Sequence, residues 1–153
     1  MSPSGFLARG GGWVVAQSAL MIAILVAGPR WGRAGWPSVL VGIPFVFLGA
    51  WIGILGVRHL GAARSALPEP LPGAPLVQEG IYARVRHPLY ASLLWLSAGW
   101  TSCWLSPASG AASLLLLVLL QAKARSEEDR LIRLHPGYEA YRNRVPAFLP
   151  RWR

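Results

Sequence analysis

The feature that most constrains this chain is a set of three long stretches without a charged side chain. They cover residues 10–29, 34–57 and 88–122, with lengths of 20, 24 and 35 residues in a chain of 153. Apolar stretches of this length are typical of membrane-spanning helices, because a helix needs about 20 residues to cross a bilayer. Only 14% of the residues are charged, against about 25% in soluble domains. We therefore predict an all-α integral membrane protein, a single domain over residues 1–153.

The three stretches divide into about four predicted transmembrane helices, at residues 13–27, 36–57, 89–105 and 108–122. The third stretch is too long for one span, and Ser106-Pro107 near its middle favours a tight turn. We expect a helical hairpin there; one span followed by a re-entrant piece is the alternative.

Small residues and prolines indicate how the helices are packed and connected. Residues at four-residue spacing are predicted to bring helices close together: Ala19, Ala23 and Ala27 in the first span, and Gly49 and Gly53 in the second. Residues 65–80 contain four prolines and are predicted to form a loop, because proline cannot continue a helix. In the polar tail, the acidic segment 126–129 either caps a new helix or continues the fourth span, and Pro136 favours a further short helix.

The distribution of positive charge predicts the topology. With four spans, both termini lie on one side of the membrane, together with 13 of the 15 Lys and Arg residues; Arg30 and Arg33 lie on the other. Because cytoplasmic segments carry an excess of Lys and Arg, both termini and the helical tail are predicted to be cytoplasmic. The cations flank the apolar stretches, which favours membrane topology over nucleic acid as the reason for the net charge of +9.

Several kinds of site are not supported by the composition. Cys103 is the sole cysteine, which leaves no disulfide within the chain. His59, His87 and His135 are scattered without the spacing of metal ligands, so no metal site is predicted. Nucleotide-binding glycine loops and a Ser-His-Asp arrangement are also missing from the sequence.

Two polar segments, residues 78–90 and 125–144, lead into and out of the predicted hairpin. They should therefore meet at one membrane–water boundary, although they lie about 40 residues apart in the sequence. Taken singly, Arg84 and Arg86 are explained as flanking anchors and the tyrosines as interfacial aromatics. Membrane anchoring explains the combination less well, because four of the six acidic residues lie in the second segment.

Both segments resemble known family motifs. The first reads Leu76-Val77-x-x-Gly80-x-Tyr82-Ala83-x-x-Arg86-His87-Pro88-x-Tyr90, and the second reads Glu127-Glu128-x-x-Leu131 followed by Tyr138-x-x-Tyr141-x-x-Arg144-Val145-Pro146-x-x-Leu149-Pro150. In order and spacing they are similar to the motifs of isoprenylcysteine carboxyl methyltransferases and their bacterial relatives. Phospholipid methyltransferases share the general arrangement.

This resemblance implies S-adenosylmethionine as the methyl donor, bound at the cytoplasmic mouth by residues 76–92 and 123–150, and suggests a bacterial inner membrane protein. The residues expected to form the cofactor pocket are Leu76, Val77, Tyr82, His87, Pro88, Tyr90, Glu127 and Glu128. Arginine suits the donor's carboxylate, glutamate its amine or hydroxyls, and tyrosine its adenine.

The same resemblance implies a lipophilic acceptor, either a small molecule or a lipid, that reaches the site laterally from the membrane. A carboxylate is the leading candidate and needs no base, because it is already ionised. Arg86 and Arg144 are the predicted catalytic residues, and Lys123 and Arg125 the predicted substrate contacts. An amine or thiol acceptor would need deprotonation, by Glu128 or His87 in the amine case. A non-catalytic membrane scaffold is the alternative from a different class.

Overall fold

The computed structural model describes residues 10–61 and 76–149, and these residues form helices joined by short connections. The elements are α2 (Gly11–Trp31), α3 (Trp36–Leu60), the 3-10 helix η2 (Gly80–Ala83), α4 (Pro88–Trp104), α5 (Pro107–Leu134) and α6 (Tyr138–Arg144). No β-strand occurs in this part of the chain, which confirms the all-α prediction for it.

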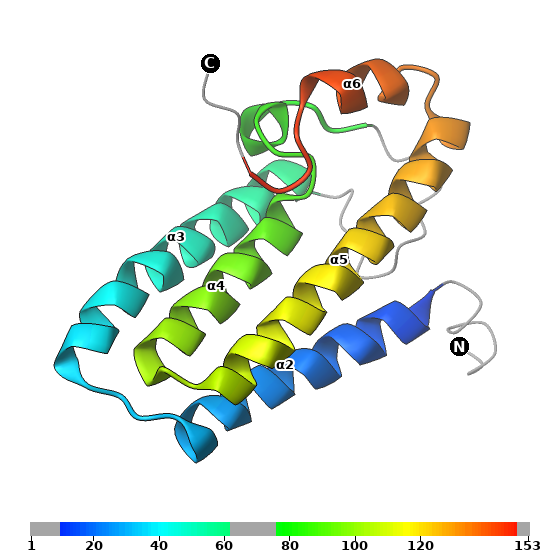
Figure 1. Cartoon of the computed structure of the whole chain (residues 1–153). Helices are drawn as coiled ribbons and strands as arrows, with labels where there is room; N and C mark the ends of the chain where they lie inside the picture. Colours follow the sequence, from blue (N-terminus) through cyan, green and yellow to red (C-terminus); the bar gives the residue numbers. More distant parts are fainter. Residues whose placement is uncertain (1–9, 62–75, 150–153) are drawn as a thin grey trace.

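Three helices, α2, α3 and α5, are long and apolar enough to cross a membrane by length and composition. Helix α4 has 17 residues and lies beside α3 and α5 (Figure 1). The hairpin over residues 88–122 is thus confirmed as two helices that turn at Leu105 and Ser106. Four complete spans, and the side on which the tail lies, remain predictions.

Local sequence explains where these helices begin. Proline, which has no backbone N–H to leave unpaired, occupies the first turn of α3, α4 and α5. The Ser106 hydroxyl accepts a hydrogen bond from the Ser109 N–H and thereby caps α5. Between α4 and α5, Leu105 adopts a left-handed conformation with φ of 48°, which gives a turn of only two residues.

Glycines allow α3 and α4 to pack closely along their length. A Cβ at Gly49 would lie 2.9 Å from the Leu96 N atom, and one at Gly53 would lie 2.6 Å from the Ser92 Oγ atom. The Gly49 and Gly53 pair is therefore confirmed as a helix contact. At Gly42 a Cβ would come within 2.5 Å of a carbonyl oxygen of α4, so this crossing requires glycine.

Helix α2 packs against α5 and α4 through larger side chains. Ile24 contacts Leu116 and Leu120 in a fully buried cluster. The predicted alanine contact face is wrong in part: Ala27 is buried, but Ala19 and Ala23 are exposed. The larger Ile24 side chain faces α5 instead, because α2 and α5 pack by interdigitating their side chains. The α3 and α4 pair differs, since glycines bring those two backbones close together.

Serine hydroxyls join the helices at the end of the bundle that contains both short turns, residues 32–35 and 105–106. We call this the turn end. Ser106 donates to the Ala27 carbonyl at 2.9 Å, Ser109 to the Ile24 carbonyl at 3.2 Å, and Ser38 to the Cys103 carbonyl at 2.8 Å. All three serines are buried. These neutral bonds tie α2 to α5 and α3 to α4.

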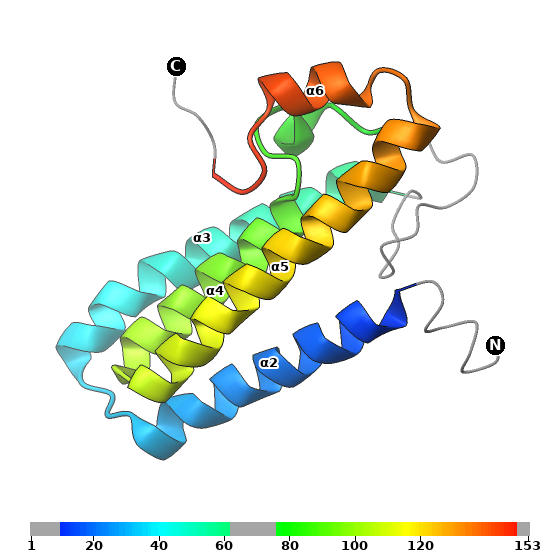
Figure 2. The same cartoon turned by 45° about the vertical axis from the view of Figure 1, so that its right-hand side comes forward.

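The opposite end of the bundle carries η2, α6 and the last turns of α5 (Figures 1 and 2). Helix α5 continues past residue 122 to Leu134 without a break, so residues 126–129 extend the fourth predicted span and do not cap a separate helix. Pro136 precedes α6, which begins at Tyr138. The proline-rich segment of the predicted loop, residues 65–75, lies outside the described residues.

Candidate active site

The site is built where the start of α4 meets the chain that follows α6. The Arg86 N–H donates to the Pro146 carbonyl at 2.9 Å, and the His87 N–H donates to the Ala147 carbonyl at 3.0 Å. These two backbone bonds hold the tail against the residues that precede α4. The two sequence motifs therefore meet in space, as predicted.

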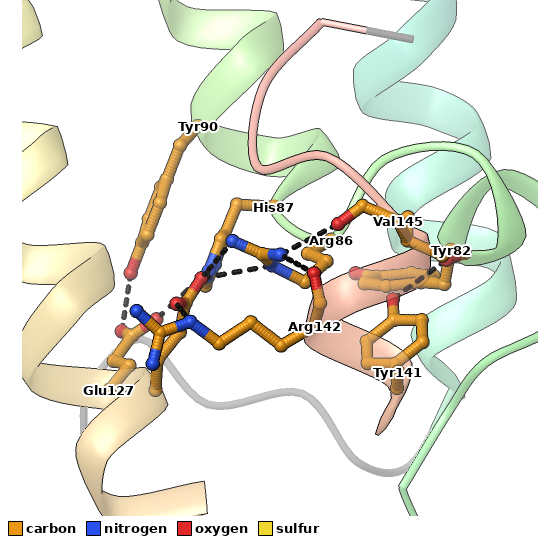
Figure 3. Close-up of polar contacts among 9 residues, drawn as sticks. Tyr82, Arg86, His87, Tyr90, Glu127, Tyr141, Arg142 and Val145 are labelled. Carbon is orange, nitrogen blue, oxygen red and sulfur yellow. Dashed lines mark hydrogen bonds and ion pairs between the residues drawn. The ribbon is translucent and has the colours of Figure 1, made fainter. Parts of the chain in front are cut away.

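The Glu128 carboxylate receives three cationic or imidazole partners, and Figure 3 shows these partners, Arg86, His87 and Arg142, close together. The Oε1 atom of Glu128 accepts from Arg86 Nε at 3.0 Å and lies 2.9 Å from both Arg86 Nη2 and His87 Nε2. Its Oε2 atom lies 3.1 Å from Arg142 Nε. Glu128 is 3% exposed, and a buried carboxylate of this kind is stable only when it is paired.

Arg86 also fixes the end of helix α6. Its Nη1 atom donates to the Val145 carbonyl at 2.6 Å and to the Arg142 carbonyl. Four of the five guanidinium N–H groups are therefore directed at protein atoms. Arg86 thus joins α4, α5 and the tail. Its planar guanidinium has N–H donors in several fixed directions, so it can bind these groups at once, which a lysine ammonium could not.

Glu127 faces the aromatic side of the site. Its Oε1 atom accepts a hydrogen bond from the Tyr90 hydroxyl, and its Oε2 atom lies 3.7 Å from His87 Nδ1. The His87 and Tyr90 rings stack with their centroids 5.4 Å apart, and Phe148 lies 6.0 Å from His87 at a tilt. The two adjacent glutamates thus contact opposite nitrogens of one imidazole.

A group of buried tyrosines supports the site from the tail side. The Tyr141 hydroxyl donates to the Tyr82 carbonyl at 2.7 Å, and Tyr138 packs edge-on against Tyr141. Burial raises the pKa of Tyr82 to about 12, with a smaller contribution from the Glu127 charge. Burial likewise raises the pKa of Tyr141 to about 12 and also raises the pKa of Tyr138. These phenols are therefore neutral hydrogen-bonding groups at pH 7.

Lys123 lies one helical turn before Glu127 on α5. It is 3% exposed; its Nζ atom donates to Gln17 Oε1 of α2 at 3.0 Å and lies 4.9 Å from the centroid of the Tyr90 ring. This cation thus has a neutral amide and an aromatic face as its described contacts.

The other residues predicted for the site differ in burial and in their distance from the carboxylates. Pro88 is buried in the first turn of α4, and Leu76 packs against the tyrosine group. Val77 is half-buried, and Arg125 is exposed on α5. Arg144 is exposed, and its Nε atom donates to the Ala140 carbonyl within α6. The structure therefore brings Arg86, but not Arg144, to the carboxylates.

Three residues at the site were not predicted from the sequence: Arg142, Phe148 and Gln17. The Arg142 side chain is 43% exposed yet reaches Glu128. For Arg142 the available signal was helical spacing, because it lies four residues after Tyr138 of the tail motif and therefore shares a face of α6 with it.

This arrangement can bind a ligand that carries opposite charges and a flat ring. Two carboxylates suit an ammonium or hydroxyl groups, two arginines suit an anion, and the His87, Tyr90 and Phe148 rings offer flat surfaces. In the described part of the chain, no three His, Cys, Asp or Glu side chains are grouped to hold a metal ion. The fold and the contacts around Glu128 define a helical integral membrane protein with a cluster of charged and aromatic side chains at one end of the bundle.

Comparison with known proteins assigns the family. The model of the isoprenylcysteine carboxyl methyltransferase (ICMT) family matches residues 41–133, more than half of the chain. The chain belongs to this family. The matched region contains α4, most of α3 and nearly all of α5, and thus includes Arg86, His87, Tyr90 and both glutamates of the site.

Individual relatives extend over most of the chain. It is 29% identical over 150 residues to the nickel-cobalt-cadmium resistance protein NccN of Alcaligenes xylosoxydans xylosoxydans, with coverage of 94% of this chain. The chain spans 65% of that relative's length. The fold is similar to that of the eukaryotic intramembrane Ras methyltransferase ICMT, with a TM-score of 0.67 and 19% identity over 92% of this chain and 53% of the other. The last likeness concerns the fold alone.

Proposed function

We propose that this protein transfers a methyl group from S-adenosylmethionine to a lipophilic acceptor at the membrane surface. Membership of a methyltransferase family, together with the carboxylate, arginine and aromatic groups gathered around Glu128, carries the proposal. The site lies at the polar end of apolar helices, where a donor from water and an acceptor from lipid can both arrive. We further propose that this end faces the cytoplasm, because the Lys and Arg residues collect there, and that the membrane is a bacterial inner membrane, which the similarity to NccN of Alcaligenes supports.

The residues present fit the chemistry of the donor. Glu127 and Glu128 would hold its amine and ribose hydroxyls, and the stacked rings of His87 and Tyr90 would face its adenine. When bound, the donor supplies an electrophilic methyl group on a sulfonium. The protein's part is then to align the acceptor with that methyl group and to exclude water.

A carboxylate is the proposed acceptor group. It is ionised at neutral pH, so the new O–C bond forms as the C–S bond breaks and no proton has to be removed. The remaining cations near the site, Lys123 and the tail arginines, would orient such an anion. An amine acceptor would instead require a base, and both oxygens of Glu128 are already in contact with cationic or imidazole groups.

The proposal is tested with the full chain purified in nanodiscs. We expect S-adenosylhomocysteine to bind in a calorimetric titration and to raise the thermal unfolding temperature. Radiolabelled methyl transfer into lipid extracts and prenylcysteine analogues would then identify the acceptor, and base-labile label would indicate an ester. If neither a calorimetric nor a thermal response to S-adenosylhomocysteine is observed, the enzyme proposal is wrong.

A further inference from the structure

Lys123 stands out among the charged residues because it is buried without an acidic partner in contact. Each of the two site arginines, Arg86 and Arg142, contacts Glu128. Lys123 is more withdrawn from solvent than either arginine, at 3% exposure, and no ion pair within 4.0 Å includes it among the described residues; the Glu127 charge acts on it from beyond that distance. An ionisable side chain within a membrane helix is costly and indicates a functional role unless its partner explains it.

The direction of the side chain argues against a simple membrane anchor. A lysine that serves as an anchor extends toward the membrane surface and places its ammonium in water. The Lys123 ammonium instead lies 3.0 Å from Gln17 Oε1 and 4.9 Å from the centroid of the Tyr90 ring, between α2, α4 and α5. Glu127 follows one turn later and is engaged by Tyr90 and His87.

The donors of Lys123 exceed its described acceptors. An ammonium has three N–H donors, and Gln17 accepts from one of them. The Tyr90 ring face is electron-rich but is not an anion. The Gln17 amide also carries an NH2 group that could donate to the same incoming anion. The pair therefore offers a compact set of donors in a place that polar solvent does not reach.

We propose that Lys123, positioned by Gln17, binds the anionic group of the lipophilic acceptor, so that α2 forms one side of the acceptor site. This inference rests on the proposed function. It adds Gln17 to the site, and Gln17 lies in α2, which is outside the family match at residues 41–133. Figures 1 and 2 show α2 beside α5, so an acceptor anion held by Lys123 and Gln17 would lie where these two helices meet. The Lys123 ammonium would repel a cationic amine at the same place, against the attraction of the Glu127 carboxylate one turn away.

The test measures binding of three membrane probes to the full chain in nanodiscs. The probes are a fluorescent fatty acid, its methyl ester and the amine of the same chain length. Binding of each probe is monitored by energy transfer from the protein's tryptophans. We expect the acid to bind about tenfold more tightly than the ester, because a charge-assisted hydrogen bond forms away from water. Lys123→Met should abolish this preference, and Lys123→Arg should keep most of it.

Gln17 is tested by two substitutions with different outcomes. Gln17→Leu should weaken acid binding severalfold, because Lys123 loses its positioning contact. Gln17→Glu places a carboxylate beside the ammonium, so the acid should lose its advantage and the amine should gain. Matched controls are Arg133→Gln and Asn143→Asp, which make the same charge changes at exposed positions of α5 and α6. Both should keep the preference of the wild-type chain for the acid.

Binding of S-adenosylhomocysteine, measured in the same nanodiscs, separates this inference from the proposed function. If that ligand binds every variant but the acid preference survives Lys123→Met or Gln17→Glu, the acceptor assignment is wrong and the methyltransferase proposal stands. If the acid preference depends on Lys123 but the wild-type chain does not bind S-adenosylhomocysteine, the proposed function is wrong.

Discussion

The two ends of the bundle hold their helices together by different physical means. At the turn end, buried serine hydroxyls donate to backbone carbonyls of neighbouring helices, and these bonds involve no charge. At the other end, which we call the charged end, Arg86, His87, Arg142 and the two glutamates connect α4, α5 and the tail. Neutral bonds between fixed backbones set geometry, whereas charged groups can exchange one partner for a ligand. The difference therefore predicts where substitutions affect stability alone and where they also affect binding.

The largest effect is expected from Glu128→Ala at the charged end. Removing this carboxylate leaves Arg86 and Arg142 without a counter-charge, and breaking a buried pair costs about 3 kcal/mol or more. We expect a clear drop in the thermal unfolding temperature and a large loss of S-adenosylhomocysteine affinity in a calorimetric titration. Glu139→Ala removes an exposed acid from the first turn of α6 and serves as the control. Unchanged stability and affinity in Glu128→Ala would show that the charged cluster contributes neither to folding nor to ligand binding.

Gly42→Ala should produce the next largest effect, and it should affect stability alone. The added methyl group would lie 2.3 Å from Cys103 Sγ and 2.5 Å from the Gly99 carbonyl oxygen, so α3 and α4 would have to separate. Overpacking of this kind costs about 1–3 kcal/mol. Thermal unfolding should show the loss, while the folded fraction keeps its ligand affinity.

Gly12→Ala, in α2, is the matched control for Gly42→Ala, because no atom lies within 4 Å of its added Cβ. If the two glycine variants unfold at the same temperature, the close crossing of α3 and α4 does not stabilise the bundle.

Ser106→Ala should weaken the turn end by about 2 kcal/mol. The substitution removes the cap of α5 and the bond to the Ala27 carbonyl, and each loss costs about 1 kcal/mol. Ser18→Ala, at an exposed position of α2, should have almost no effect. Stability is followed by urea or thermal unfolding in detergent. A loss of ligand affinity larger than the loss of stability would contradict the division between the two ends.

Arg142→Ala should give the smallest change in stability and a change in binding of opposite sign to that of Glu128→Ala. The Arg142 side chain is 43% exposed, and its pair with Glu128 should contribute less than about 1 kcal/mol. The substitution frees Glu128 Oε2 for a ligand ammonium, so S-adenosylhomocysteine should bind equally or slightly more tightly. A strong loss of affinity in a calorimetric titration would instead make Arg142 a ligand contact.

Much of this molecule was determined by the sequence alone. Helix positions followed from uncharged stretches and prolines, because hydrophobicity and backbone restrictions act locally along the chain. The meeting of the two polar motifs also followed, because a hairpin returns its ends to the same membrane face. Gly49 and Gly53 were found in the same way, since a small residue has the same effect on any neighbouring helix.

The tertiary structure decided which side chains became partners. The sequence favoured Arg144, but the rotation of α6 places Arg142 against Glu128, and the rotation of α2 buries Ile24 in place of Ala23. The contact of Lys123 with Gln17 joins residues 106 positions apart. Such pairs depend on the rotation and offset of whole helices, which are set by packing over many residues at once. Local patterns in one sequence do not contain that information.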